Sequence, residues 1–270
     1  MNIKFTIFTP TYNRANFLSR CYQSIVNQNV SSLEWIIIDD GSTDNTAELV
    51  RDFISEKKIN IRYFYQKNSG KQVAWNVAMK ESNGTYFIGL DSDDTLVENS
   101  LLNIEKNLHE LEDNNMLIGL RCLAINQNTL KPDSSFSPKG SHTCSWFYEF
   151  SSRIFGERID ILKTSIIKNF PYPTDEKIKF IPEIWFYSIT AYYGYKFIYL
   201  NEPVRLFYDD HNQFRLSKSS IRKNARGHYI ARMAMLRFIP MRFFIKNPIA
   251  FLKTVVRFAQ CIYFIAKDNK

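Results

Sequence analysis

The chain has 270 residues, of which 45% are hydrophobic, 23% charged and 15% aromatic; this composition is that of a globular protein and excludes disordered, collagen-like and low-complexity chains. Its length allows one large domain, or one domain with an appendage, whose core needs no disulfide or metal for stability. The net charge of +8 is concentrated in residues 221–270, which contain eleven basic residues and one acid, whereas residues 1–220 carry −2; this excludes a generally basic enzyme and indicates one attachment surface.

Strand-like and helix-like patterns alternate over residues 4–90. The expected strands are 4–9, 35–38, 61–65 and 86–90, and the expected helices are 14–27, 43–54 and 71–79. The first residues alternate as a strand does and lack the basic start and long apolar run of a secretory signal. Strands that alternate with helices of this length predict an α/β fold with a mostly parallel central sheet flanked by helices on both faces.

From about residue 114 the pattern is less regular. The expected elements are strands at 116–125, 196–200 and 204–208 and a helix at 183–193, while 127–145 is expected to be a polar loop and 153–169 mixes strand and helix signals. No linker is visible before about Ser217, so we expect residues 1–220 to form one domain. Four well-separated cysteines form no CxxC pair and complete no zinc spacing, which favours a reducing, intracellular compartment.

The last part of the chain, 221–270, is expected to be a basic amphipathic helical tail. Residues 248–266 are nearly long enough to span a bilayer. However, basic and polar side chains recur at a spacing that lines them along one face of a helix, beside a broad apolar face; they are Lys246, Lys253, Arg257, Gln260 and Lys267. A helix that lies in the membrane interface needs this arrangement, so we expect membrane-surface attachment. A core-packing helix, or a helix that binds nucleic acid or a protein, is the alternative.

Acidic residues follow two of the expected strands. Asp39 and Asp40 follow the strand at 35–38, and an Asp-Ser-Asp-Asp run occupies 91–94 after another. Ligands of an open parallel sheet bind at the carboxyl ends of its strands. Three carboxylates in one such run repel each other unless a cation lies among them, and Mg²⁺ or Mn²⁺ would also bring substrate phosphates. The alternative is that these residues cap a helix that begins near Thr95.

Two common nucleotide motifs are absent from the sequence. None of the nine glycines builds GxGxxG, and Gly70-Lys71 lacks the preceding glycine of a P-loop. Phosphates would therefore have to be held by a metal and by side chains. The motifs that are present are FTIFTPTYNRANFLSRCYQSIVNQ, then WIIIDDGSTDNT, then NSGKQVAWNVAMKESNGTYFIGLDSDD.

With these three motifs in this order, the chain resembles the inverting glycosyltransferases of family 2, which have the GT-A fold, and among them the type that serves bacterial polysaccharide biosynthesis. The resemblance is dense over about the first 110 residues and looser to about Ser220. It implies transfer of a sugar from a nucleotide-diphosphate donor, usually UDP-linked, to a hydroxyl of a glycan or lipid-linked acceptor, assisted by Mn²⁺ or Mg²⁺. With the basic tail, it implies a cytoplasmic protein at the inner face of the cell membrane, with no nucleic acid as partner.

The resemblance also implies site residues. Those expected to bind the nucleotide are Thr9, Pro10, Thr11, Tyr12, Arg14, Asp40, Gly70, Lys71, Asp91 and Ser92. Within this set Asp40 would hydrogen-bond the base and Asp91 would face the ribose or sugar. Asp93 would hold the metal that bridges both phosphates, and Asp94 would support the site. Asp39 and Ser42 are expected only to shape a turn.

For the catalytic base, the resemblance implies an acid at the start of a helix downstream of the metal motif, and Glu183 fits. An inverting transfer needs a carboxylate that takes the proton of the acceptor hydroxyl. Ile184 follows where the family more often has a second acid, and a glutamate at a helix start is also favoured by the helix dipole alone. Asp175 and Glu176 are the fallback bases.

Residues 208–217 resemble the family's segment that closes over the donor. There His211 could ligate the metal, and Arg215 or Lys218 could contact the diphosphate; the alternative is that they are ordinary surface residues. Two other functions stay open. A metal-dependent nucleotidyltransferase would use similar carboxylates but usually has a glycine- and lysine-rich loop near its N-terminus. A non-catalytic basic module that binds membrane or nucleic acid would leave the acidic strand ends unexplained.

Overall fold

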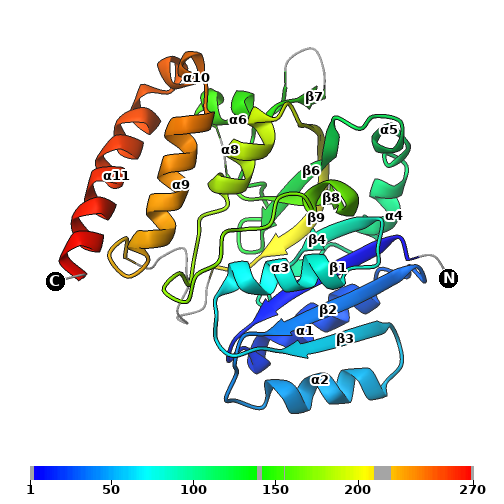
Figure 1. The fold of residues 1–270 in the computed structure, drawn as a ribbon. Helices are drawn as coiled ribbons and strands as arrows, with labels where there is room; N and C mark the ends of the chain where they lie inside the picture. The colour runs from blue at the N-terminus through cyan, green and yellow to red at the C-terminus, as the bar shows by residue number, and fades with distance from the viewer. Residues whose placement is uncertain (1–2, 139–141, 155, 210–219, 269–270) are drawn as a thin grey trace.

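The alternation expected for the N-terminal part is present in the computed structural model, which describes residues 3–138, 142–154, 156–209 and 220–268. Four strands are parallel and lie in the order β3-β2-β1-β4 (Figure 1). These elements are β1 (Phe5–Thr11), α1 (Ala15–Val26), β2 (Leu33–Asp39), α2 (Thr46–Ser55), β3 (Asn60–Tyr65), α3 (Lys71–Glu81) and β4 (Tyr86–Gly89). Central strands such as β2 are buried on both faces, which explains their continuous apolar sequence.

The second half of the chain extends the same sheet with mixed strand directions. Its elements are β5 (Thr95–Leu96), α4 (Ser100–Glu105), α5 (His109–Glu112), β6 (Leu117–Asn126), β7 (Thr143–Cys144), α6 (Trp146–Ser152), β8 (Arg158–Lys163), α7 (Thr164–Ile167), α8 (Ile184–Tyr192) and β9 (Lys196–Phe207). β8 is antiparallel to both β4 and β6, β6 is parallel to β9, and β5 and β7 are antiparallel to β9. The described sheet therefore has nine strands and is parallel mainly in its N-terminal half.

One local expectation and one alternative are wrong. The strands expected at 196–200 and 204–208 are one strand, β9, because irregular register against β6 accommodates Pro203 without ending the strand. No helix begins near Thr95, since residues 95–96 form β5 and α4 begins at Ser100. The acids at 91–94 are therefore not helix caps.

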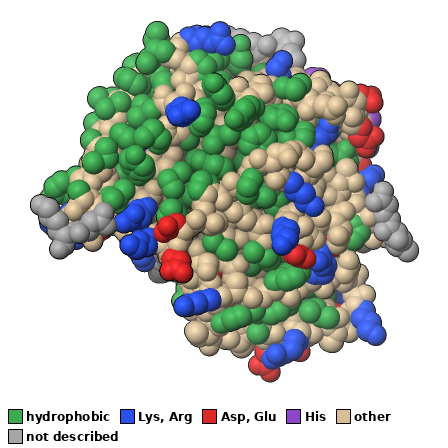
Figure 2. Space-filling view, viewed as in Figure 1, with side chains coloured by type: hydrophobic (Ala, Val, Ile, Leu, Met, Phe, Trp, Pro, Cys, Tyr) green, Lys and Arg blue, Asp and Glu red, His purple; other side chains and the backbone are tan. Residues whose placement is uncertain are grey.

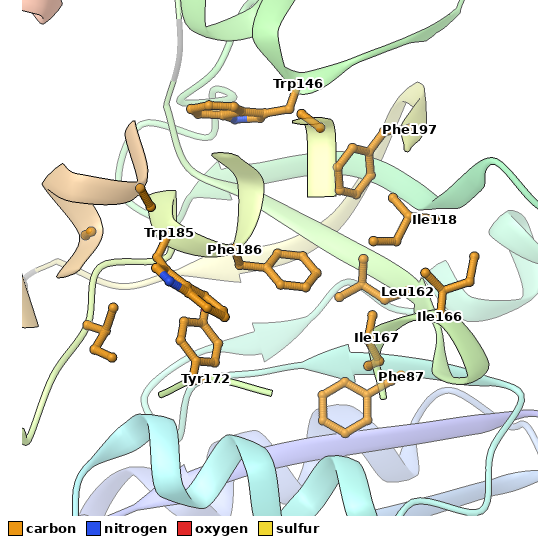
Figure 3. Packing of buried hydrophobic residues seen from close by; sticks show 14 of the residues in the cluster. Phe87, Ile118, Trp146, Leu162, Ile166, Ile167, Tyr172, Trp185, Phe186 and Phe197 are labelled. Atoms are coloured by element: carbon orange, nitrogen blue, oxygen red, sulfur yellow. The ribbon is translucent and has the colours of Figure 1, made fainter. Parts of the chain in front are cut away.

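The core consists of two clusters, one on each face of the sheet. One cluster packs α1, α2 and α4 against the sheet, and the other packs α3, α8, α9 and α10 against its opposite face. In the second cluster Phe186 of α8 points toward the sheet strands, and Trp185 lies beside Tyr172 with ring centroids 4.8 Å apart (Figure 3). This packing fixes the N-terminal end of α8, which directly follows Glu183.

Three helices follow the sheet: α9 (Ala225–Phe238), α10 (Met241–Lys246) and α11 (Pro248–Asp268). α9 packs on α8, and α11 lies beside α9 (Figure 1). Buried residues of α9 and α10, including Ala231, Met235 and Phe244, belong to the same cluster as α8. By contrast, α11 buries only Thr254 and Cys261, and by length and composition alone it could cross a membrane.

Candidate functional site

The predicted site residues meet where the parallel strands end. Thr11 at the end of β1 lies opposite Asp39 of β2, and Phe8 of β1 lies opposite Gly89 of β4. The segments that follow β1, β2 and β4 are therefore neighbours at one edge of the sheet, as expected for a ligand site in this type of fold.

The end of β1 contributes side chains of different kinds. Thr9 is buried, and its hydroxyl accepts a hydrogen bond from the Trp35 indole at 2.9 Å. Thr11 is also buried, and its hydroxyl has no hydrogen-bond partner in the structure. Tyr12 is 49% exposed, so its ring is available to a ligand. Among these residues Tyr12 is the one that can stack on a planar base.

Asp39 shapes a turn, as expected. Its carboxylate is buried and accepts hydrogen bonds from the Ser42 amide at 2.7 Å and the Tyr63 hydroxyl at 2.6 Å. Burial and the Asp39 charge raise the pKa of Tyr63 well above its usual value, so the phenol stays a donor. Asp39 therefore holds β2 to β3 and is not directed at a ligand.

Asp40 holds the segment that leads into α3. One of its oxygens accepts from the Gln66 side-chain amide and the Ser69 backbone amide, both at 2.7 Å, and the other accepts from the Gly70 amide at 2.9 Å. A carboxylate can accept about four hydrogen bonds. Asp40 thus retains acceptor capacity for a ligand while it fixes the segment 66–70.

Gly70 allows two distant segments to touch. Its φ is +97°, and a Cβ placed there would lie 2.2 Å from the Lys179 carbonyl oxygen. A side chain would therefore be excluded both by conformation and by space. The Lys179 ammonium also donates to the Asn68 carbonyl at 2.6 Å. As a result, the loop before α3 is held against the loop that carries Glu183.

Each acid of the 91–94 run is paired with a basic side chain from another element. The pairs are Asp91–Lys71 at 2.8 Å, Asp93–Arg14 at 3.4 Å and Asp94–Arg205 at 2.8 Å. The mutual repulsion of these carboxylates is therefore offset by the protein itself. The repulsion between these carboxylates, on which the sequence-based prediction of a metal was founded, therefore does not by itself require a metal.

The surroundings of Asp91 and Asp94 shift the pKa values of these two acids in opposite directions. Burial raises the pKa of Asp91, but the charges of Lys71 and Arg205 outweigh it and hold the pKa below its usual value. Burial also raises the pKa of Asp94, to about 7, because Arg205 only partly offsets burial and the neighbouring carboxylates. Asp91 is thus an anion near neutral pH.

Lys71 links Asp91 to Glu183. Its ammonium lies 2.8 Å from Asp91 and 3.5 Å from Oε1 of Glu183. Burial lowers the pKa of Lys71, but the charges of Asp91 and Glu183 outweigh it and hold the pKa above its usual value. The three groups line one hollow together with Arg205 and Pro10. The predicted base therefore lies beside the predicted donor-binding acids, whereas Asp175 and Glu176 are exposed and do not line the hollow.

A third acid in the hollow, Asp160, is held by other side chains. Its carboxylate accepts two hydrogen bonds from Arg121, at 2.7 and 2.8 Å, and one from the Tyr187 hydroxyl at 2.7 Å. Arg121 also donates to the buried Glu149 at 2.7 Å. The Glu183 side chain, in contrast, is 57% exposed. Glu183 is therefore the better placed of the two to accept a proton from a ligand.

Sequence reasoning missed Arg205 and Asp160, which lie on β9 and β8. They occur far from the motifs and follow no recognisable spacing, so only the fold brings them into the hollow. Ser92, which was predicted, is buried within the 91–94 run. His211, Arg215 and Lys218 lie outside the described residues.

A divalent cation fits this site only together with a ligand. Within the described ranges, no three His, Cys, Asp or Glu side chains are close enough to hold a metal ion. Mg²⁺ and Mn²⁺ sites, however, commonly use one or two carboxylates and complete their coordination with substrate phosphates. The hard oxygens of Asp93 meet that requirement.

Known proteins resemble this chain in sequence. A family model described as glycosyl transferase family 2 matches residues 6–167. The chain is 38% identical over 114 residues to an uncharacterized glycosyltransferase of Rickettsia bellii, 33% over 109 residues to glycosyltransferase GlyA of Streptococcus pneumoniae and 35% over 136 residues to chondroitin synthase of Pasteurella multocida. These alignments cover 42%, 40% and 50% of this chain but only 16%, 16% and 13% of the relatives.

Solved structures resemble the fold over most of the chain. Staphylococcus aureus TarS 1–349, in complex with UDP-GlcNAc, has a TM-score of 0.67 over 87% of this chain and 67% of that chain, at 19% identity. The mannosyltransferase PcManGT from Pyrobaculum calidifontis, in complex with GDP-Man and Mn²⁺, has a TM-score of 0.61 over 99% of this chain and 75% of that chain, at 16% identity. The shared architecture is the GT-A fold.

Proposed function

The chain belongs to glycosyltransferase family 2, whose model matches more than half of its residues, and we propose that it transfers a sugar from a UDP-linked donor to a hydroxyl of a glycan or lipid-linked acceptor, with inversion. The contact of Lys71 with both Asp91 and Glu183 carries this proposal. The acid that we assign to the donor, Asp91, and the carboxylate that we assign to the acceptor side, Glu183, thus lie within reach of the same ammonium. Such a pairing is what a displacement between two bound substrates requires.

The nucleotide lies along the edge formed by β1, β2 and the segment before α3. Tyr12 covers the base, and Asp40 accepts a hydrogen bond from the uracil N–H with its remaining capacity. Gly70 lets the backbone approach the ribose, Lys71 and Arg14 contact the diphosphate, and Asp91 faces the ribose or sugar. The complex of TarS with UDP-GlcNAc supports a uridine donor. Because PcManGT is in complex with GDP-Man, GDP is the nucleotide to test against UDP.

Asp93 would hold Mn²⁺ or Mg²⁺ together with the donor's phosphates, and His211 is a candidate second ligand. When bound, the metal offsets the charge that develops on the leaving diphosphate. The Mn²⁺ in the PcManGT complex supports this assignment. Asp94 supports the site by holding Arg205, and Arg215 is a further candidate for contact with the diphosphate.

Glu183 acts as the general base. Its carboxylate takes the proton of the acceptor hydroxyl while that oxygen attacks the anomeric carbon from the face opposite the diphosphate. The bond between that carbon and the diphosphate oxygen breaks, and UDP leaves. The exposure of its side chain leaves room for an acceptor. Lys71 keeps the carboxylate at the edge of the hollow next to the donor's position.

We place this reaction in cell-surface polysaccharide biosynthesis, in the cytoplasm at the inner face of the membrane. The similarity to chondroitin synthase supports a polymeric product. Residues 221–270, with ten net positive charges, form the membrane-surface tail that follows the transferase domain at 1–220.

Calorimetric titration with UDP, GDP and dTDP, with and without Mn²⁺, tests the donor site. We expect Mn²⁺-dependent binding of UDP that Asp93→Ala abolishes. Asp52→Ala, which removes an exposed carboxylate of α2, serves as the control and should bind UDP as the wild type does. If no nucleotide binds to the wild type under any of these conditions, the proposed donor site is wrong.

A further inference from the structure

The helix α11 has a packed face and an exposed face. On the packed face Thr254 and Cys261 are fully buried, and Phe258 stacks on Tyr229 of α9 with centroids 5.0 Å apart. The exposed face is apolar. Together with exposed apolar side chains of α10, it forms what we call the docking face: Met241, Ile245, Ile249, Leu252, Val255, Val256, Ile262 and Tyr263.

Single exposed apolar residues are normal on protein surfaces, but a continuous group of this size indicates a binding surface. Ile245 is 73% exposed and Leu252 64% exposed. Figure 2 shows hydrophobic side chains gathered over the part of the surface where α9, α10 and α11 lie, with Lys and Arg side chains at the top and the lower edge of this region and one within it. The docking face is thus a rimmed apolar patch, not scattered residues.

The charges along α10 and α11 are basic up to Asp268, the last residue of α11. Lys246, Lys253, Arg257 and Lys267 are exposed and follow one edge of the apolar face, and no acid occurs between residues 221 and 267. Anionic headgroups attract each such charge by about 1 kcal/mol. A second copy of this chain would instead bring two basic edges together, so the charge favours an anionic lipid surface as the occupant.

The arrangement favours a helix that lies on the membrane rather than one that crosses it. Lys253 and Arg257 lie in the middle part of α11, and each would cost about 2.5–3.5 kcal/mol near the bilayer centre. Spanning would also strip α11 from α9 and expose Thr254 and the ring of Phe258. Lying in the interface keeps the packed face on α9 and places the charges at the headgroups.

The docking face is rigidly connected to the segment that carries Glu183. A Cβ at Gly227, in the first turn of α9, would lie 1.8 Å from the Phe180 carbonyl oxygen, so α9 touches this segment backbone to backbone. The rings of His228 and Phe180 also meet, with centroids 6.1 Å apart. Because α11 packs on α9, a contact that holds α11 in one position therefore also holds the position of the hollow at Glu183.

We propose that the docking face of α10 and α11 lies in the plane of an anionic membrane surface and presents the Glu183 hollow to an acceptor carried in that membrane. The second part of this proposal rests on the proposed function. The first part rests only on the exposed face, the basic edge and the packing of α11 on α9.

Co-sedimentation of the full chain with vesicles tests the docking face. The wild type should bind vesicles of phosphatidylglycerol and phosphatidylcholine and bind pure phosphatidylcholine much more weakly. Leu252→Glu with Val256→Glu, and separately Lys253→Glu with Arg257→Glu, should each weaken binding to the mixed vesicles by about tenfold or more. Ile54→Glu, which changes an exposed apolar residue of α2, should leave vesicle binding unchanged.

Two further measurements keep the outcomes distinct. UDP titration of the same variants should match the wild type, which shows that the fold is intact and separates the docking face from the donor site. Bound protein should be released from the vesicles by alkaline carbonate. Protein retained in the carbonate pellet would show a spanning helix. A wild type that binds no vesicles but forms dimers, which Leu252→Glu dissociates, would show that a second copy of the chain is the occupant. Either result overturns the proposal.

Discussion

Glu34 is an acid with no exposed surface on the central strand β2. Its oxygens accept hydrogen bonds from the Thr6 hydroxyl at 2.6 Å, the Asn83 amide at 2.7 Å and Arg62 at 3.3 Å. Burial raises its pKa, but these hydrogen bonds outweigh burial and hold the pKa below its usual value. The sequence pattern could not predict this buried acid, because its hydrogen-bond partners come from three separate parts of the chain.

Because the folded pKa of Glu34 is depressed, its contribution to stability is present above its unfolded pKa of about 4.3. That contribution should be lost as the pH falls through the folded value. Glu34→Gln should lower the free energy of unfolding at neutral pH by about 1–3 kcal/mol, and the deficit relative to wild type should shrink in acid. Urea unfolding at several pH values measures this. An equal effect from the exposed Glu98→Gln would count against it.

Lys71 is the residue at which the donor and acceptor sides of the proposed site meet. Lys71→Met should weaken UDP binding by about tenfold or more, because a hydrogen bond to a charged group contributes about 1.5–3 kcal/mol. Lys80→Met removes an exposed lysine from the same helix and should leave the affinity unchanged. Calorimetric titration measures the UDP affinity of each variant. If Lys71→Met binds UDP as tightly as the wild type does, Lys71 is not part of the donor site.

Among single residues, the acids of the motif and two of their basic partners, Lys71 and Arg14, could be predicted from the sequence, whereas the third partner, Arg205, could not. Asp91, Asp93 and Asp94 follow a strand within one short run, so the sequence predicted that they lie together. Arg205, which pairs with Asp94, comes from a strand whose position next to the motif is set only by the sheet.

At the scale of elements, the alternating pattern predicted β1 to β4 and α1 to α3 to within a few residues. Strands buried on both faces have continuous apolar runs, and helices between them have one apolar side, so both signals are strong. The pattern failed at β9, because Pro203 is a usual strand breaker and the bulges that accommodate it depend on β6.

The contact between α9 and the segment before Glu183 gives an element-scale prediction. In Gly227→Ala the new methyl group meets the Phe180 carbonyl, so either α9 or the segment must move. We expect unfolding free energy to fall by about 1–3 kcal/mol and donor turnover to fall more than UDP affinity. Thermal unfolding and titration of Gly227→Ala measure both. Met233→Ala on the exposed side of α9 should change neither.

At the scale of the whole molecule, the three motifs predicted the GT-A fold before any contact was known. The insertion of antiparallel β8 between β4 and β6 was not predictable, because strand order depends on packing between residues far apart in the sequence. The same holds for α9 and α10, whose buried side chains share a cluster with α8. Composition identified their basic charge but not where they would pack.

The central claim is that Glu183 accepts the acceptor's proton beside a UDP-sugar. Release of UDP from UDP-GlcNAc, UDP-glucose and UDP-galactose, with Mn²⁺ and added glycan or lipid acceptors, tests it most directly. Glu183→Gln should slow release by about a hundredfold or more while UDP affinity stays unchanged, and Glu176→Gln should retain the wild-type rate. A Glu183→Gln protein that releases UDP as fast as the wild type would contradict the claim.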